Sequence, residues 1–516
     1  MNWTEGYASD VEYTAGFYRE QGPAMLNFAC VLNGFEPVAI DKPYTYCELG
    51  FGRGLTANIL AASNPLGRFY AADFNPAHVA GAQQLADAAQ LDNLTLLENS
   101  FAEMAEGKVA GLPQFDFITL HGIYTWVTEE NRKHIVDFIA RYLKPGGIVY
   151  LSYNAMPGWS TGLPLHRLLV EHADLNPNRS DVQIKSAAAF IDQLKALDAG
   201  YFNTSPMIDE RIKILKNASS NYLVHEYMHR HWQPLYHIDV ANEMLPAKLD
   251  YVGSADLHFA FPTYCFTKER LQLLATIPNS ALRETLKDYF LNTSFRKDIF
   301  VRGARRIPAT RQEDYLKRIG VALLIEREHV KLNIKLPTLE VDLNRGVVDP
   351  MLDRLTARPH SLAELAASYQ GKGPSLFELA HVIAMLSASN QATIYPISDQ
   401  QHDPAPALRM NRALSEQTRH SDDYQALASP VLGNGMLLSY IARLTYFLLT
   451  QRIDPREADI DTIVRHAWPI MKQQNRQIYR EGKLLETDEE NIAELAVHIK
   501  SILQTQLPAW RHLKMI

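Results

Sequence analysis

Residues 47–56 read CELGFGRGLT, and this stretch decides the fold. Gly50, Gly52 and Gly54 stand between an apolar segment at 44–49, predicted as a strand, and one at 55–63, predicted as a helix. Glycine at such a junction permits positive φ and a close approach of the backbone to a ligand. Many nucleotide-binding folds use a loop of this kind, so the glycines predict a ligand without identifying it.

Strand-like and helix-like segments alternate on both sides of this loop. The pattern predicts strands at 44–49, 68–72, 94–97, 115–121 and 148–153, and helices at 22–34, 55–63, from Pro76 onward, and 129–143, the last broken by KPGG. Strands and helices that alternate at this spacing predict an α/β domain with a parallel sheet covered by helices on both faces, a Rossmann-like fold.

Two acidic residues indicate which ligand the loop binds. Glu48 lies two residues before the first glycine, where it would repel a pyrophosphate, and Leu55 stands where a dinucleotide loop has its last glycine. S-adenosylmethionine instead offers a cationic ammonium and a sulfonium to such a carboxylate. Asp73, at the end of the second strand, can accept both ribose hydroxyls. The alternative is a generic Rossmann-like fold in which these residues serve as turns and caps.

The predicted cofactor site draws on the ends of several strands. Asn99, Ser100 and Phe101 follow the third strand and are placed to reach the adenine. The full set predicted to bind S-adenosylmethionine is Glu48, Gly50, Phe51, Gly52, Gly54, Asp73, Phe74, Asn99, Ser100, Phe101 and His121.

Several motifs resemble known methyltransferases. ELGFGRG, with ADFNP after the second strand, resembles class I methyltransferases. Further segments resemble the rickettsial lysine methyltransferases of outer-membrane proteins and their methyltransferase regulatory domain: HGIYTWV (121–127), LKPGGIVYLSYNAMPGW (143–159), NYLVHEYMHRHWQPLY (221–236), RETLKDYFLNTSFRKDIFVRG (283–303), AWPIMKQQNRQIYREGKLL (467–485) and LPAWRHL (507–513). The resemblance implies a protein-lysine methyltransferase that uses S-adenosylmethionine. Thr56 departs from the asparagine that this family often has there.

Aromatic and polar residues follow two strands where the fold would put an active site. His121, Tyr124 and Trp126 follow the fourth strand, and Tyr153, Asn154 and Trp159 end or follow the fifth. A desolvated aromatic channel lowers the pKa of a lysine amine and holds the methylated cation. His121 and Glu226 are the candidates for accepting a proton, and an N-terminal segment with Tyr13 and Tyr18 is a candidate lid. The alternative role for each aromatic residue is packing.

Residues 225–229 read HEYMH, which matches the H-E-x-x-H pattern of zinc proteases. The longer zinc pattern fails, because Trp232 and Leu235 occupy its glycine and third histidine positions. We therefore expect no metal, and we expect His225, Glu226 and Tyr227 at the interface between the second domain and the active site.

The length of 516 residues suggests several domains. We expect a methyltransferase domain at 1–165, a mainly helical regulatory domain at 166–335 without further strand–helix alternation, a winged-helix-like segment at 336–400 and a helical C-terminal region at 401–516. Residues 398–408 are polar and contain proline, as in a linker. The winged-helix-like segment has few basic residues, so it favours protein over DNA contacts.

The composition of the chain limits the classes of molecule that we expect it to bind. The net charge of −7 does not favour nucleic acid, and the chain has no apolar run long enough to span a membrane. Three cysteines without a zinc or disulfide spacing, and a polar N-terminus, favour a cytoplasmic protein. The large additions to the catalytic fold favour a protein substrate. Two alternatives remain: an enzyme with a small-molecule acceptor, and a protein that binds the cofactor without catalysis. The sequence carries no indication of oligomeric state.

Overall fold

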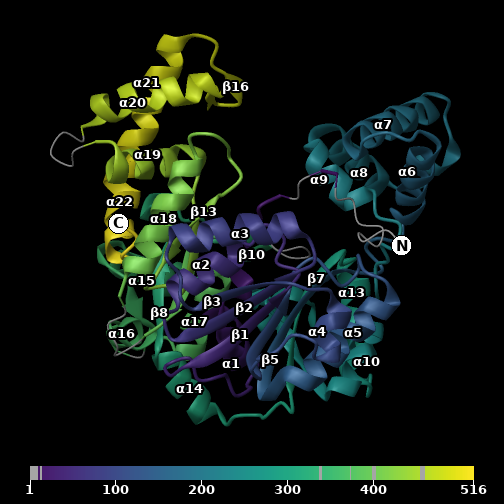
Figure 1. Cartoon of the computed structure of the whole chain (residues 1–516). Helices are drawn as coiled ribbons and strands as arrows, with labels where there is room; N and C mark the ends of the chain where they lie inside the picture. Colours follow the sequence, from purple (N-terminus) through teal and green to yellow (C-terminus); the bar gives the residue numbers. More distant parts are fainter. Residues whose placement is uncertain (1–9, 12–13, 336–339, 372, 398–402, 454–458) are drawn as a thin grey trace.

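The computed structural model describes residues 10–11, 14–335, 340–371, 373–397, 403–453 and 459–516. Its centre is a seven-stranded sheet of order β3-β2-β1-β4-β5-β7-β6, in which β1 to β5 are parallel and β7 runs antiparallel to both its neighbours (Figure 1). The strands are β1 (Tyr44–Leu49), β2 (Gly67–Asp73), β3 (Leu94–Glu98), β4 (Phe115–Leu120), β5 (Leu143–Asn154), β6 (Leu249–Ser254) and β7 (Phe295–Arg302). The predicted Rossmann-like fold is confirmed.

Each face of the sheet packs on its own apolar core. Alternate residues of β1 point to opposite sides, so Tyr44 and Tyr46 join one core while Cys47 and Leu49 join the other. Helices contribute to these cores, namely α1 (Pro23–Leu32), α2 (Leu55–Ser63), α4 (Phe101–Glu106), α5 (Glu129–Tyr142) and α10 (His237–Met244). Further helices of this part of the chain are α3 (Pro76–Ala88), α11 (Pro262–Cys265), α12 (Lys268–Ala275) and α13 (Ser280–Leu291).

The KPGG segment does not separate helix α5 from the fifth strand by a loop. Strand β5 already begins at Leu143, which pairs with Phe115, and the pairing shifts between Phe115 and Phe117. Gly146 has φ +79°, a value that glycine adopts without strain. The expected end of the helix before KPGG is confirmed, since α5 ends at Tyr142. The fifth strand begins at Leu143 and not at the expected residue 148, because an irregularity in the β4–β5 pairing absorbs the glycines within the strand.

The expectation that residues 180–335 lack further strand–helix alternation is also wrong. Strands β6 and β7 extend the sheet beyond β5, with Leu151 opposite Asp298 and Val301 opposite Asp250. Strand β7 reads FRKDIFVR, and its three successive charged residues hide the apolar pattern of a buried strand. The segment from 166 to 335 thus contributes two strands to the catalytic sheet, across the domain boundary expected at residue 165.

A helical lobe is inserted between β5 and β6. It consists of α6 (Leu163–Leu175), α7 (Ser180–Ala196), α8 (Pro206–Asn217) and α9 (Ser220–Tyr227), and it stands beside the carboxyl ends of the strands (Figure 1). Its own apolar core includes Leu169, Ile191 and Val224 and extends to Trp159 and Trp232 in the flanking segments. The lobe therefore has a core of its own while one side of it faces the sheet.

A small mixed unit follows the sheet. Three strands in the order β11-β8-β12 and a separate β9–β10 pair combine with three helices, and the winged-helix-like character of this unit stays a prediction. Its strand β8 precedes the expected boundary at 336, and the unit packs on α1 and α14 through a shared core. The helix α14 (Ala309–Lys317) precedes the unit, whose elements are β8 (Ile319–Leu323), β9 (Asn333–Lys335), β10 (Glu340–Asp342), α15 (Arg345–Ala357), β11 (His360–Ser361), α16 (Leu362–Ala367), α17 (Leu376–Ala388) and β12 (Ala392–Pro396).

The C-terminal region is mainly helical and packs on α2 and α3, beside the glycine loop. It contains α18 (Ala405–Gln417), β13 (Ala426–Ser429), β14 (Asn434–Leu437), α19 (Tyr440–Gln451), α20 (Ile460–Gln473), β15 (Tyr479–Arg480), β16 (Lys483–Leu484), α21 (Asp488–Ser501) and α22 (Leu507–His512). Of the expected linker at 398–408, residues 398–402 lie outside the described part, and from Ala405 the chain is already helical. Among the described helices, none has the length and apolar character needed to cross a bilayer.

Candidate active site

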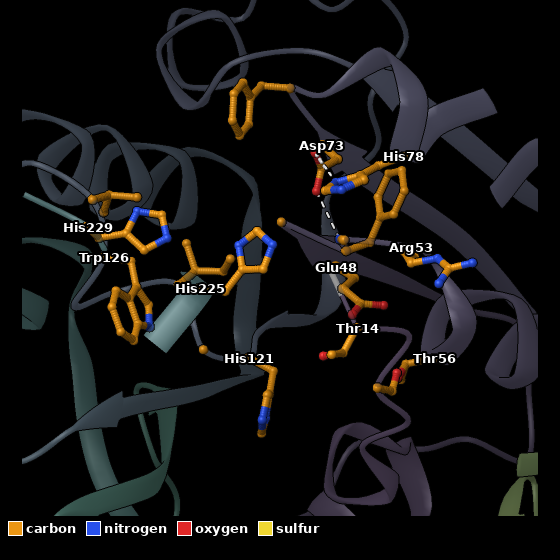
Figure 2. A pocket seen from close by; sticks show the side chains of 18 of the residues that line it. Thr14, Glu48, Arg53, Thr56, Asp73, His78, His121, Trp126, His225 and His229 are labelled. Atoms are coloured by element: carbon orange, nitrogen blue, oxygen red, sulfur yellow. Dashed lines mark hydrogen bonds and ion pairs between the residues drawn. The ribbon is translucent and has the colours of Figure 1, made fainter. Parts of the chain in front are cut away.

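A cavity of about 840 Å³ lies at the carboxyl ends of the central strands. Its floor carries the glycine loop after β1 and the ends of β2, β3 and β4, and its other boundaries come from residues 14–18, helix α9 and the start of β7. Figure 2 shows Glu48, Asp73 and His78 on one wall, facing His225, His229 and Trp126 on the other. This is the position at which open α/β sheets bind ligands.

The three glycines of the loop have different structural roles. Gly50, Gly52 and Gly54 all have positive φ, at +70°, +58° and +72°. Gly50 and Gly52 line the cavity, whereas Gly54 does not. A Cβ on Gly54 would lie 2.5 Å from the Cβ of Ala82, so this glycine allows α2 to approach α3 closely.

Asp73 holds the loop as well as lining the cavity. Its Oδ2 accepts the backbone N–H of Gly52 at 2.9 Å, and its Oδ1 accepts the N–H of Asn75 at 2.9 Å. Nδ1 of His78 lies 3.2 Å from the same Oδ1 (Figure 2). A carboxylate oxygen accepts more than one hydrogen bond, so Oδ2 retains capacity for a ribose hydroxyl.

Glu48 is a buried acid with one unsatisfied oxygen. Its Oε1 accepts a hydrogen bond from the Nε2 amide of Gln21 at 3.2 Å, and its Oε2 is buried without a hydrogen-bond partner among the described residues. Burial raises the pKa of Glu48 to about 8, although the bond from Gln21 acts in the opposite direction. An unpaired buried carboxylate beside a cavity is stabilised by a cation, so Glu48 fits a ligand with an ammonium or sulfonium group.

The remaining predicted cofactor residues all line the cavity. Ser100 caps α4 in a reciprocal capping box with Glu103, which directs the preceding loop toward the cavity. The residues in this group are Phe51, Phe74, Asn99, Ser100, Phe101 and His121.

His121 is enclosed between aromatic and polar neighbours. The ring of Tyr18 stacks on it at 3.5 Å between centroids, and its Nδ1 lies 2.8 Å from the hydroxyl of Tyr150. Burial lowers the pKa of His121 to about 3. The imidazole is therefore neutral at physiological pH, and its basicity is too low for it to take a proton efficiently there.

The wall opposite the glycine loop comes from the helical lobe and the segments that lead to it. Trp126, Trp159, Tyr222 and Glu226 line the cavity on this side. Burial raises the pKa of Glu226 to about 7, while the Arg211 guanidinium acts to lower it. A carboxylate with a pKa near neutrality suits proton transfer at physiological pH.

Asn154, Tyr124 and Tyr153 differ in their access to the cavity. Asn154 lines it and accepts the Thr125 hydroxyl at 3.1 Å. Tyr124 and Tyr153 are not among the lining residues. The Tyr124 hydroxyl donates to Glu243 at 2.5 Å and the Tyr153 hydroxyl to Asp298 at 2.7 Å, so the structure uses both predicted catalytic tyrosines in buried contacts away from the cavity.

The H-E-x-x-H segment is not a continuous helical turn. Helix α9 ends at Tyr227, so His229 lies beyond it, and Nε2 of His225 donates to the carbonyl of Val11 at 3.1 Å. Of the three residues expected at the interface between the lobe and the active site, His225 and Glu226 line the cavity, whereas Tyr227 does not and packs in the apolar core of the lobe. His229 also lines the cavity.

Residues 14–18 cover part of the cavity, as the lid hypothesis expects for Tyr18, whereas Tyr13 lies outside the described residues. The Tyr18 N–H donates to Thr56 Oγ1 at 3.1 Å, which gives Thr56 a role in holding this segment. Ser294 and Phe295, just before and at the start of β7, also line the cavity, and neither was predicted as a site residue. They lie in the segment 283–303 that resembles the family, but nothing in that segment indicates the cavity, because the pairing of β7 with β5 brings them there.

Two family models match the chain. The one described as "Methyltransferase domain" matches residues 47–149, and the one described as "Predicted methyltransferase regulatory domain" matches residues 219–302. In the structure the second region begins at the end of the helical lobe and ends with β7. The matched regulatory region therefore contributes part of one wall of the cavity, including Tyr222 and Glu226, and the strands β6 and β7 of the sheet.

Other proteins resemble this chain over its whole length or over part of it. The uncharacterized protein sll1526 of Synechocystis sp. is 34% identical over 507 residues, covering 98% of this chain and 97% of that protein. The uncharacterized protein RP028 of Rickettsia prowazekii is 24% identical over 42% of this chain and 86% of its own length. The solved structure of PKMT2 from Rickettsia typhi in complex with AdoHcy superposes with a TM-score of 0.68 at 17% identity, covering 97% of this chain and 99% of that one.

Proposed function

The chain belongs to the class I S-adenosylmethionine-dependent methyltransferases that carry a methyltransferase regulatory domain, and we propose that it N-methylates lysine side chains of a protein substrate. The observation that carries this proposal is the pairing of two unlike walls across one cavity. One wall has the glycine loop with Glu48 and Asp73, and the other has Trp126, Tyr222 and Glu226.

The first wall suits the cofactor. When bound, S-adenosylmethionine supplies a methyl group on a cationic sulfonium. Glu48 has an unsatisfied buried oxygen for a cationic group, and Asp73 can accept a ribose hydroxyl while it holds Gly52. Phe51 and Phe101 add apolar surface for the adenine.

The second wall suits a lysine amine. A lysine with its ordinary pKa of about 10.4 is protonated at neutral pH and must lose a proton before it attacks a methyl group. The aromatic rings of Trp126 and Tyr222 favour the neutral amine by excluding water, and they attract the cationic methylated product. Glu226, with a pKa of about 7, is the group we assign to take the proton.

The size of the chain and its relatives support a macromolecular acceptor. Binding of a small acceptor does not require additions as large as the helical lobe, the winged-helix-like unit and the C-terminal region. The structural similarity to PKMT2 extends over 97% of this chain, so these additions are shared with that protein and not only the catalytic sheet. We propose a cytoplasmic location for the enzyme, because its three cysteines are free and buried.

The test is transfer of a labelled methyl group by the purified full chain. The chain is incubated with S-adenosylmethionine labelled at the methyl group and a bacterial lysate, the products are separated on a gel, and labelled bands are hydrolysed to amino acids. We expect label in protein bands and its recovery as methyl-lysine. The matched control is Gly52→Asp, which adds a side chain and a charge at a positive-φ position of the loop.

Each outcome separates the alternatives. Label found only in small molecules would contradict a protein acceptor, and label recovered as methyl-arginine would contradict lysine. Absence of any transfer by a chain that binds AdoHcy in calorimetry would contradict catalysis, because the cofactor site would then be intact.

A further inference from the structure

A second groove, with a volume of about 700 Å³, lies between α3 of the methyltransferase fold and α18 of the C-terminal region. It neighbours the active-site cavity, because Arg53 and His78 line both. Its volume falls within the usual range for small-molecule sites. None of the functions assigned above uses this groove.

The groove is rich in positive charge. Arg53, Arg409 and Arg412 line it, and Glu416 is the single acidic residue among its lining residues. Glu416 is itself paired with Arg419 at 2.8 Å. The balance of charge in the groove therefore favours an anion, although the chain as a whole is acidic.

Two of these arginines lack a carboxylate partner. Within the described part of the chain, Arg409 and Arg412 form no ion pair, whereas Arg53 pairs with Asp423 at 2.8 Å. Nε of Arg409 donates to the carbonyl of Ala89 at 2.7 Å, which fixes the direction of its guanidinium. A positioned guanidinium without a carboxylate is suited to bidentate recognition of an oxyanion.

A glycine in the middle of α3 adds a second, independent observation. Gly81 lines the groove, and no atom lies within 4 Å of the position its Cβ would occupy. Glycine within a helix costs about 1 kcal/mol relative to alanine. A ligand can approach the backbone of a helix closely only where there is open space, and the space beside Gly81 is open.

We propose that this groove binds a small phosphate-bearing anion, with Arg409 and Arg412 as its main contacts and α3 near Gly81 as its floor. Phosphate oxygens match the planar fork of a guanidinium, and two arginines on one helix can hold neighbouring phosphoryl groups.

The bound anion would act on the cofactor site through the two shared residues. His78 contacts Asp73, which holds Gly52, and Arg53 belongs to the glycine loop itself. An added negative charge beside Arg53 favours a cationic ligand in the neighbouring cavity. S-adenosylmethionine carries a net positive charge and AdoHcy carries none, so the anion strengthens binding of the first more than of the second.

The test is calorimetric titration of sodium pyrophosphate into the full chain saturated with AdoHcy, at fixed ionic strength. We expect saturable binding at one site. Arg409→Gln combined with Arg412→Gln is expected to weaken it by about tenfold or more, and Gly81→Leu to block it. The matched control is Arg465→Gln, which removes an exposed arginine from α20, and it should bind pyrophosphate as the unaltered chain does.

Binding of AdoHcy by every variant verifies that each is folded. No saturable binding by the unaltered chain, or equal binding by the double arginine variant, would overturn the proposal. Citrate binding as tightly as pyrophosphate would overturn the preference for phosphate. The coupling is tested by measuring both cofactor affinities with and without pyrophosphate, and an equal change for S-adenosylmethionine and AdoHcy would contradict it. None of these measurements depends on methyl transfer or on the identity of the acceptor.

Discussion

The carboxylate of Asp73 accepts the backbone N–H of Gly52 at 2.9 Å, so the acid at the end of β2 holds the glycine loop that follows β1. Gly52 follows β1 and Asp73 ends β2, the neighbouring parallel strand, in which Ala71 pairs in register with Glu48 of β1. The loop and the acid therefore form one rigid unit, and a change in either residue affects both the shape of the loop and its contact with the cofactor.

Asp73→Ala is expected to weaken AdoHcy binding by about a hundredfold, since it removes a charge-assisted bond to the loop together with a contact to the ribose. Calorimetry measures this change. Asp87→Asn, on the exposed side of α3, is the matched control and should leave the affinity unchanged. An Asp73→Ala chain that binds with unaltered affinity would show that neither contact matters.

Binding of S-adenosylmethionine is expected to strengthen as the pH rises toward about 8. Burial raises the pKa of Glu48 to about 8, so at neutral pH the free protein holds Glu48 mostly protonated, and a cationic ligand must displace that proton. Titrations in buffers of different ionisation enthalpy should detect proton release at pH 7. In Glu48→Gln this release should disappear, and its persistence would assign the proton to another group.

The rate of methyl transfer at saturating substrate is expected to rise through about pH 7, as Glu226 loses its proton. Glu226→Gln should remove this inflection and lower the rate by about a hundredfold, with AdoHcy affinity retained. His121→Gln should keep the inflection, because the pKa of His121 is about 3 and its imidazole is already neutral. An inflection lost in His121→Gln but kept in Glu226→Gln would reverse the assignment.

A buried ionic cluster joins β7 to α13. Arg296 contacts Asp288 at 2.7 Å, Asp298 at 2.9 Å and Glu284 at 3.1 Å. Burial alone would raise the pKa of Asp298, but Arg296 and His237 outweigh it and bring the pKa below its ordinary value.

Arg296→Met should destabilise the fold by about 3–5 kcal/mol, because it leaves buried carboxylates without their partner. Urea unfolding followed by a probe in the sheet measures this loss, and Lys268→Met, at an exposed position of α12, is the control. Adding Asp298→Asn should restore part of the stability. A loss no larger than that of the control would show that the cluster is not needed for stability.

Local sequence patterns were sufficient to predict secondary structure and site residues where a segment is apolar and ends at a glycine or an acidic residue. The sequence predicts the bounds of β1 and α2 correctly, since CELGFGRGLT carries both the strand end and the helix start. Glu48 and Asp73 were found for the same reason, because each lies at the end of such a strand.

Other features of the fold and of the site depend on contacts between segments that are distant in the sequence. Strand β7 has three successive charged residues, and contacts with other segments explain them: Asp298 meets His237 and Arg296 in the interior, and Lys297 pairs with Glu20. Tyr124 and Tyr153 stand at positions that suggest catalysis, yet their hydroxyls are used by Glu243 and Asp298. Phe295 reaches the cavity through strand pairing alone. A pattern read along one chain does not contain this information.

The late position of β7 has a consequence for synthesis of the chain on the ribosome. Leu151 in β5 pairs with Asp298, so the β5 edge is made long before the strand that covers it. At about 5–20 residues per second, this edge waits roughly ten seconds or more with its apolar strand unpaired. The helical lobe is synthesised during that interval, and its folding beside the carboxyl end of β5 would shield part of the nascent sheet from other chains. A protein released early, before β7 emerges, would keep the open edge and would be prone to aggregate.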